Sequence, residues 1–598
     1  MAIARYSVNQ HPVQTILTWI GSGEIAIPEI QRPFVWNATK VRDFIDSLYQ
    51  GYPVGYLIAW RNPAVRLKDG STSQGKRILI DGQQRVTALL AAFLGKRLID
   101  KNYRRVSIRI AFRPDEERFE VANPAIQKDR GWLADIAKIL SPETKILRLV
   151  DDYCRNNPGS DKDRIYESIE RLRAVVNNHI GLIELNSDLD IETVTEIFIR
   201  INSEGVVLSQ ADFAMSKIAA NESYGGNILR KCIDYFCHLA VAPEFYHQLA
   251  DIDRDFAKAD YFQKMAWLRH EKDDLYDPSY TDMLRVAFIS QFKRGRLGDL
   301  VALLSGRNFD TRTYEEEIAD ASFRRLEQGL MQFMNETHFK RFLMIIRSAG
   351  FIEASMIRSQ NTLNFAYVIY LVLRARGEQA TQIESLVRRW FVMSVLTGRY
   401  SASPETAFDR DIRQIDHVGA TAYLKSIEEA ELGGPFWEAG LPMQMDTSVA
   451  SSPYFNVFLA SQVRANDKGF LSRDITVHDL ILHKGDVHHV FPRNYLIKHG
   501  FTRSRYNQIT NYVMMQSEIN VQIGDGPPCE YFSDLLNACR DGRSAYGGIC
   551  NLEELQANLA AHCIPEGIEN MTLQEYDTFL DKRRRLIARK IRAYYESL

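Results

Sequence analysis

Residues 77–90, with the sequence RILIDGQQRVTALL, decide the fold of the N-terminal part of the chain. The apolar ILI triplet is typical of a buried strand. Asp81 and Gly82 form a turn, and the residues from Gln83 onward open a helix with good helix formers. A strand that passes into a helix through an Asp-Gly turn predicts a sheet flanked by helices.

Strand and helix signals continue to alternate on both sides of this junction, up to about residue 220. Asn37 is expected to cap a helix, and Pro114 with Asp115 predicts the turn of a β-hairpin. The expected strands are residues 54–60, 106–112, 118–121 and 180–185, and the expected helices are residues 37–50 and 191–201. We therefore predict an α+β multidomain protein whose N-terminal α/β domain covers residues 1–225.

Long amphipathic stretches replace this alternation further along the chain and predict a helical domain over residues 226–440. Its aromatic and methionine residues recur at helical spacing, which favours core packing over cofactor binding. The examples are Phe262 with Met265 and Trp390 with Met393. Residues 433–453 are rich in turn formers and predict an irregular linker to a third domain, residues 441–598.

The overall composition is that of an ordinary globular protein. The net charge of −2 and the isoelectric point near 6.7 give no global attraction to nucleic acid, so DNA would have to bind a local basic surface. The seven cysteines include no C-x-x-C pair and are expected to be free thiols. With no signal peptide and no membrane-spanning run expected, we predict a cytoplasmic protein without a membrane partner.

Five of the 13 histidines lie between residues 478 and 499. Two of them are adjacent in residues 486–492, DVHHVFP, and Asn511 and Asn520 follow downstream. Cleavage of a phosphodiester bond needs a divalent cation and a neutral imidazole that deprotonates water. His488 and His489 would point to opposite faces of a strand, so only one of them can be the base. A structural histidine pair with two turn asparagines is the alternative.

The strand-to-helix junction at residues 81–85 has features of a phosphate site. Backbone N–H groups and the helix dipole favour an anion there. Arg85 could pair with phosphate oxygens, Asp81 could bind Mg²⁺ or position water, and Gly82 allows close approach of the backbone. An Asp-Gly turn before a helix also occurs for structural reasons alone. The chain has no Walker phosphate loop, so nucleotide chemistry here would be of another kind.

The C-terminal motif resembles the HNH-like nuclease domain in the D half of GmrSD-type restriction systems. The resemblance rests on residues 486–492, 511–515, 520–525 and 528–531. It implies an HNH (ββα-metal) domain in which His489 is the general base, Asn511 braces the catalytic loop and Asn520 binds metal. His488 stands where an acidic metal ligand is expected, so Mn²⁺ or Ni²⁺ is a candidate besides Mg²⁺. Asp486 could supply the carboxylate or hold a histidine ring.

Three N-terminal blocks, residues 27–36, 81–85 and 197–208, resemble the GmrS-type domain. That resemblance implies a fold similar to ParB and sulfiredoxin and a domain that binds and hydrolyses NTP, often GTP. The implied nucleotide-binding residues are Gln31, Arg32, Asp81, Gly82, Gln83, Gln84, Arg85 and Asn202, with Asp81 and Arg85 also catalytic. Phe34, Val35 and Trp36 are candidates for a pocket that senses modified DNA, and core packing is their alternative.

A basic helix is expected near the C-terminus, over residues 581–592. Salt-sensitive contacts with DNA phosphates are one role for its cationic side chains, and a solvated face is the other. The candidate DNA contacts are Arg583, Arg584, Arg589 and Lys590.

The two resemblances together imply a single-chain, modification-dependent restriction endonuclease, similar to the fused SspE and BrxU defence proteins. NTP hydrolysis in the N-terminal domain would regulate metal-dependent cleavage of modified phage DNA at the C-terminal site, in a monomer or a homodimer. Two alternatives stay open: a DNA-binding regulatory NTPase whose nuclease domain is only a scaffold, and a toxin-like nuclease that cleaves RNA. The sequence does not specify the DNA modification or the effect of NTP.

Overall fold

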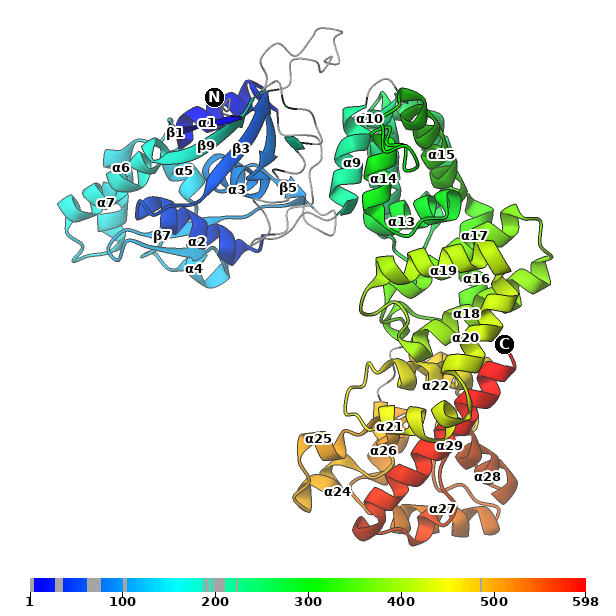
Figure 1. Ribbon diagram of the computed structural model, residues 1–598. Coiled ribbons are helices and arrows are strands. Elements are labelled where there is room, and N and C mark those ends of the chain that lie inside the picture. Colours follow the sequence, from blue (N-terminus) through cyan, green and yellow to red (C-terminus); the bar gives the residue numbers. More distant parts are fainter. Residues whose placement is uncertain are drawn as a thin grey trace. The chain divides into compact units, whose positions relative to one another are not determined.

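The computed structural model describes residues 5–26, 36–61, 77–99, 105–186, 189, 193–194, 197, 210–221, 224–483, 485 and 487–598. The chain forms two compact units, Met1–Arg230 and Lys231–Leu598. Figure 1 shows strands and helices in the first unit and mainly helices in the second. The protein is therefore α+β and mostly helical. No helix in the described ranges is long and apolar enough to cross a membrane.

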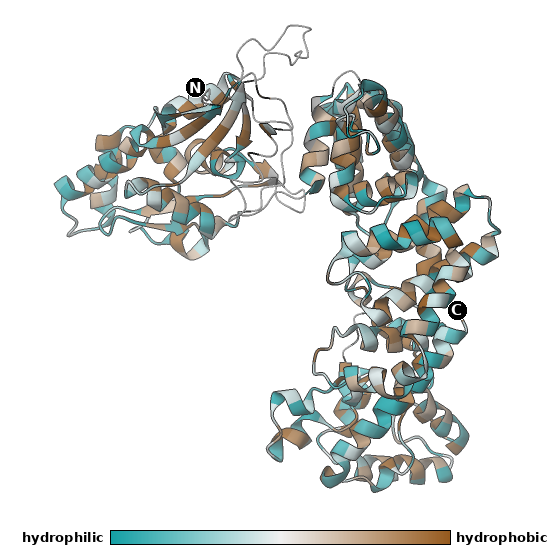
Figure 2. Ribbon diagram, in the orientation of Figure 1, coloured by the Kyte–Doolittle hydropathy of each residue, from teal (hydrophilic) through white to brown (hydrophobic). Residues whose placement is uncertain are grey.

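A five-stranded mixed sheet organises the first unit. Its strands, in spatial order, are β1 (Tyr6–Pro12), β9 (His179–Leu185), β3 (Tyr56–Arg61), β4 (Arg77–Asp81) and β2 (Ile25–Ala26). β1 pairs antiparallel with β9 and β3 antiparallel with β4, whereas β3 runs parallel to β9 and β2 parallel to β4. The strands predicted near residues 54–60, 77–80 and 180–185 are confirmed. They carry mostly hydrophobic residues in Figure 2.

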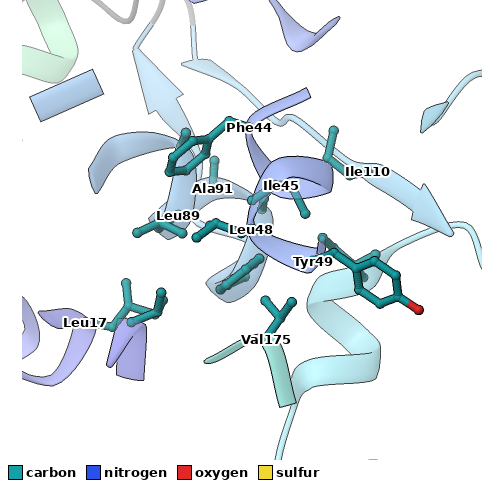
Figure 3. Packing of buried hydrophobic residues seen from close by; sticks show 14 of the residues in the cluster. Leu17, Phe44, Ile45, Leu48, Tyr49, Leu89, Ala91, Ile110 and Val175 are labelled. Carbon is teal, nitrogen blue, oxygen red and sulfur yellow. The ribbon is translucent and has the colours of Figure 1, made fainter. Parts of the chain in front are cut away.

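Helices pack on this sheet through one apolar cluster. They are α1 (Val13–Gly21), α2 (Ala38–Tyr49), α3 (Gln83–Leu94), α5 (Ile136–Leu140), α6 (Ile146–Asn156) and α7 (Lys162–Ala174). Two further helices, α4 (Pro124–Lys128) and α9 (Gln210–Ala220), complete the first unit up to residue 220. Figure 3 shows Phe44, Ile45 and Leu48 of α2 packed with Leu89 of α3. Asn37 caps α2 as predicted, because its side chain accepts a hydrogen bond of 2.8 Å from the backbone N–H of Lys40.

The predicted hairpin is also present, with a shorter first strand than expected. β7 (Ile110–Arg113) pairs antiparallel with β8 (Arg118–Val121). Val106 belongs to a separate short strand, β6 (Arg105–Val106), which pairs with β5 (Leu98–Ile99). The helix expected at residues 191–201 lies mostly outside the described residues.

The second unit begins with a helical part, as predicted. Its longer helices are α10 (Gly226–Val241), α13 (Tyr280–Phe292), α15 (Glu316–Met334), α16 (Glu336–Ser348), α17 (Gln360–Ala375), α18 (Ala380–Thr397), α19 (Pro404–Val418) and α20 (Ala420–Glu431). Phe262, Met265, Trp390 and Met393 are buried, which confirms their assignment to the core.

The predicted linker over residues 433–453 is partly helical. A π-helix covers Phe436–Gly440, and α21 (Leu441–Gln444) follows directly. Trp437 and Leu441 are buried, so apolar side chains fold this segment onto the unit, and the turn formers lie at its two ends. The prediction of an irregular connection was wrong for residues 436–444.

The histidine-bearing part follows and contains two short strands among helices. Its elements are α22 (Pro453–Arg464), α23 (Val477–Leu482), β10 (Val487–His489), α24 (Arg493–Lys498), α25 (Arg503–Tyr506), β11 (Tyr512–Met514), α26 (Ser517–Ile523), α27 (Pro528–Arg540), α28 (Leu552–Ala561) and α29 (Tyr576–Glu596). All seven cysteines of the chain are free, as predicted.

The last helix, α29, packs on the helical part of its own unit. The hydroxyl of Tyr594 donates to the backbone carbonyl of Ala349, and that of Tyr595 donates to Glu428 at 2.6 Å. The helical and histidine-bearing parts, expected as two domains that meet near residue 441, thus lie in one compact unit.

Candidate functional site

The two histidines lie on a short antiparallel ribbon. In the pairing of β10 with β11, His488 is opposite Val513 and His489 is opposite Tyr512. Because side chains alternate along a strand, the two imidazoles leave the ribbon on opposite faces. In chain order, α24 and α25 lie between the two strands, and α26 begins shortly after β11.

His489 is held by two neighbours. Its Nε2 lies 3.0 Å from Oδ1 of Asn507, and its ring packs edge-on against Tyr512 with ring centroids 5.1 Å apart. Since Oδ1 only accepts, this bond requires a proton on Nε2 and leaves Nδ1 as the basic nitrogen of the neutral ring. Burial is the main cause that lowers the pKa of His489. The hydrogen bond with Asn507 raises the pKa, and the charges of Arg493 and His488 lower it. The ring is therefore neutral near pH 7.

Asn511 is fully buried and holds the backbone that follows His489. Its Oδ1 accepts from the N–H of Phe491 at 2.8 Å, and its Nδ2 donates to the carbonyls of Phe491 at 3.1 Å and Tyr506 at 3.3 Å. Its own carbonyl accepts from the N–H of Val490 at 2.8 Å. A buried amide has no access to substrate, so Asn511 can act only by positioning this loop.

Asn520 lies on α26 with a half-buried side chain. Imidazole nitrogen and amide oxygen are donors that a divalent transition metal accepts, so the donor types of His488 and Asn520 fit such a cation. Within the described ranges, no group of three or more His, Cys, Asp and Glu side chains could hold a metal ion. A cation here would therefore need further ligands from water or a substrate phosphate. Asp486 lies outside the described residues.

The prediction that Arg583 contacts DNA was wrong. This arginine of α29 has an exposed fraction of 0% and donates to backbone carbonyls, with Nη1 2.7 Å from the oxygen of Thr510 and Nη2 3.1 Å from that of His562. Burial lowers the pKa of Arg583 to about 10, so it stays charged at neutral pH. Because Thr510 precedes Asn511, Arg583 supports the loop beside the histidines. Its burial excludes contact with DNA phosphates.

The other basic residues of α29 divide into paired and exposed ones. Arg584 binds Asp446 at 2.7 Å, and Lys590 binds Asp467 and the backbone carbonyl of Ala561. Arg589 is exposed. The phosphate contacts predicted for Arg584 and Lys590 would require these internal bonds to break.

The N-terminal junction has a geometry that demands glycine. Gly82 has φ +94° and lies between β4 and α3. A Cβ at this position would lie 2.3 Å from Cδ2 of Leu57 and 3.3 Å from its Cα. The backbone N–H groups of α3 therefore start directly beside β3, at the position predicted for phosphate.

Arg85 is fixed beside this turn. Its Nη1 donates to the backbone carbonyl of Tyr56 at 3.0 Å and lies 3.5 Å from Oδ2 of Asp81. The side chains of Asp81 and Arg85 are each 27% exposed, so both remain accessible to a ligand. Gln83 and Gln84 follow on the first turn of α3 and are half-buried.

Of the remaining predicted residues, only Trp36 is described. It packs edge-on against Phe44 and against the apolar cluster of the first unit, with the Lys40 ammonium 5.0 Å from its ring. The structure thus favours core packing over a DNA-sensing role for Trp36. Gln31, Arg32, Phe34, Val35 and Asn202 lie outside the described residues.

Sequence reasoning missed Asn507 and Arg493. Asn507 lies four residues before Asn511, directly after α25, and its contact with His489 depends on the fold of this segment. Arg493 follows the proline of the DVHHVFP motif directly. Its guanidinium lies 5.6 Å from the ring of Tyr506.

Comparison with known proteins gives two similarities. Residues 13–219 match the family model described as the N-terminal domain of the GmrSD restriction endonuclease. Across 95% of the chain, 21% of residues are identical to those of an uncharacterized protein of Methanocaldococcus jannaschii, and the match covers 96% of that protein. The family match includes the Asp81–Arg85 junction and ends well before the histidine ribbon, so it supports a restriction endonuclease relationship for the N-terminal segment.

Proposed function

We propose that this protein is a modification-dependent DNA endonuclease whose N-terminal unit binds and hydrolyses NTP. The observation that carries the proposal is the buried Asn511 amide, which fixes the backbone after a neutral, half-buried His489 on the ribbon of β10 and β11. The match of residues 13–219 to a restriction endonuclease domain supports the same conclusion from the other end of the chain.

His489 acts as the general base in this proposal. Its Nδ1 takes a proton from the attacking water, while Asn507 holds the opposite nitrogen and fixes the ring orientation. His488 and Asn520 would hold a divalent cation, with Asp486 as a further candidate. When bound, such a cation neutralises charge on the scissile phosphate and on the leaving oxygen. Mg²⁺, Mn²⁺ and Ni²⁺ are the candidates.

The nucleotide, with GTP favoured, binds at the turn before α3. Backbone N–H groups after Gly82 bind phosphate oxygens. Arg85 binds them as well, because its contacts with the described residues Tyr56 and Asp81 use Nη1 and leave the other side of the guanidinium for a ligand. Asp81 positions water or a cation. Gln83 and Gln84 are further candidate contacts, as are Gln31, Arg32 and Asn202.

Cleavage assays with matched variants test both activities. Plasmid, modified phage DNA and RNA are incubated with the purified chain, with and without GTP, in Mg²⁺, Mn²⁺ or Ni²⁺. We expect His489→Ala to abolish cleavage and spare NTP hydrolysis, and Asp81→Ala to impair NTP hydrolysis. Continued cutting by the His489→Ala variant would remove the base assignment.

Two outcomes would favour the alternatives. DNA binding and NTP hydrolysis without cutting in any metal would point to a regulatory NTPase with a nuclease-like scaffold. Cutting of RNA alone would point to a toxin-like nuclease.

A further inference from the structure

The segment around the histidine ribbon has a one-sided charge. Residues 487–517 contain four arginine or lysine residues and no aspartate or glutamate, in a chain where acidic residues slightly outnumber basic ones. The four cations are Arg493, Lys498, Arg503 and Arg505. They lie on α24 and α25, between the two strands.

Two of these cations are neutralised by carboxylates from outside the segment. Lys498 lies 3.2 Å from Asp525, and Arg505 lies 2.8 Å from Asp577. Arg493 and Arg503 are exposed, and neither forms an ion pair with any residue in the described ranges. Their positive charge is therefore directed to solvent, where it attracts anions.

Both arginines lie near His489, Arg493 in the sequence and Arg503 through hydrogen bonds of Asn507. Arg493 follows His489 by four residues, and its charge lowers the pKa of that imidazole. Arg503 accepts, through its backbone carbonyl, the N–H of Asn507 at 3.2 Å, and Asn507 binds His489. Burial raises the pKa of Tyr512, whose ring packs against His489, and the charge of Arg503 opposes that rise. The unneutralised charge thus flanks the proposed general base.

From this placement we propose that Arg493 and Arg503 form the surface that binds the phosphodiester backbone of the substrate and presents it to His489. The inference rests on the proposed nuclease function and names its substrate contacts. We favour this surface over the basic run of α29, where Arg583 is buried, Arg584 and Lys590 are paired with carboxylates or carbonyls, and Arg589 alone of the four predicted contacts is exposed. Arginine suits this role because its planar fork donates two bonds to one phosphate.

The test is the salt dependence of binding, measured on the full chain with His489→Ala so that cleavage does not interfere. Duplex DNA is compared with single-stranded DNA and RNA of the same sequence. Each lost phosphate contact should reduce the slope of log affinity against log salt by about 0.9 on duplex DNA, which is an affinity loss of about eightfold at 0.1 M salt. Arg493→Gln and Arg503→Gln should each show this loss, and the double variant should show both.

The matched controls are Arg505→Gln, whose arginine is already paired with Asp577, and Arg589→Gln on α29. Both should leave the slope within experimental error. Thermal unfolding of every variant checks that the fold is kept, and Arg493→Lys, which retains the charge, should restore most of the affinity.

An unchanged slope in the folded double variant would overturn the inference and leave the proposed function intact. Equal losses for the controls would overturn it as well, because the charge effect would then be general. If the parent binds none of the three nucleic acids, and the wild-type chain cuts none, the surface and the proposed function fail together.

Discussion

Replacing Asn511 by leucine should destabilise the second unit and abolish cleavage, although Asn511 has no access to solvent. Leucine has nearly the same size and shape but neither donates nor accepts hydrogen bonds. The change therefore removes the three side-chain bonds to Phe491 and Tyr506 and leaves most of the packing intact.

The magnitude follows from the groups left without a partner. The N–H and the carbonyl of Phe491, bonded at 2.8 and 3.1 Å, carry most of the effect, because the bond to Tyr506 is longer at 3.3 Å. A buried polar group that loses its partner costs about 1–3 kcal/mol, so the two groups of Phe491 predict a loss of about 2–6 kcal/mol. The backbone after His489 would also lose its fixed position.

Asn558 offers a matched control because it makes the same three kinds of bond elsewhere in the unit. Its Oδ1 accepts from the N–H of Leu471 at 2.9 Å, and its Nδ2 donates to the carbonyls of Gly469 at 2.9 Å and Ser472 at 3.4 Å. Asn558→Leu should therefore lose a similar amount of stability. Denaturant unfolding of the full chain gives both values, and cleavage is then measured at a temperature where both variants are folded.

Two results would refute this reasoning. A stability loss below about 1 kcal/mol for Asn511→Leu would mean that these bonds are not the main support of the loop. Equal residual cleavage by the two folded variants would mean that Asn511 has no special role in positioning His489.

Three further predictions concern buried groups. Arg583→Lys should lower stability by about 2 kcal/mol, since lysine cannot reproduce the forked bonds to backbone carbonyls, while the salt dependence of DNA binding stays unchanged. Gly82→Ala should lower the unfolding temperature more than Gly377→Ala. Both positions have positive φ, which costs alanine about 1–2 kcal/mol, but only the new Cβ at position 82 would clash with the buried Leu57. His562 is fully buried, and burial lowers its pKa to about 3 in the folded protein. As the pH falls, this histidine is therefore protonated in the unfolded chain before it is protonated in the folded one. Stability should drop by about 1.4 kcal/mol per pH unit from this group between its unfolded pKa near 6.5 and pH 3, and His562→Gln should flatten that slope.

Local signals in the sequence predicted the elements that depend on neighbouring residues. The Asn37 cap and the helix after Gly82 are set within a few residues, and the structure contains both. Residues 436–444 were predicted as irregular because turn formers surround them. Burial of Trp437 and Leu441 against the rest of the unit outweighs that local signal.

The basic run on α29 shows why the candidate site was only partly predictable. Composition and spacing identified its cations, but the sequence does not reveal which of them face the interior. Arg583 follows the helical period of the buried residues Phe579 and Leu580 and falls on the inner face. Conversely, Arg493 and Arg503 lie outside any long basic run, and the informative signal there is the missing carboxylates of residues 487–517.

The inward position of Arg583 changes how α29 can serve the site. The buried guanidinium of Arg583 binds the carbonyl of Thr510, next to Asn511, and Asn511 holds the backbone that follows His489. The far end of the same helix is bonded to Ala349 and Glu428 in the helical part. The histidine ribbon consists of two short strands, and β11 packs with Val513 in the apolar cluster that also contains Phe579 and Leu580 of α29. α29 therefore acts as a brace for the proposed catalytic loop, and contact with substrate passes to the exposed arginines beside His489.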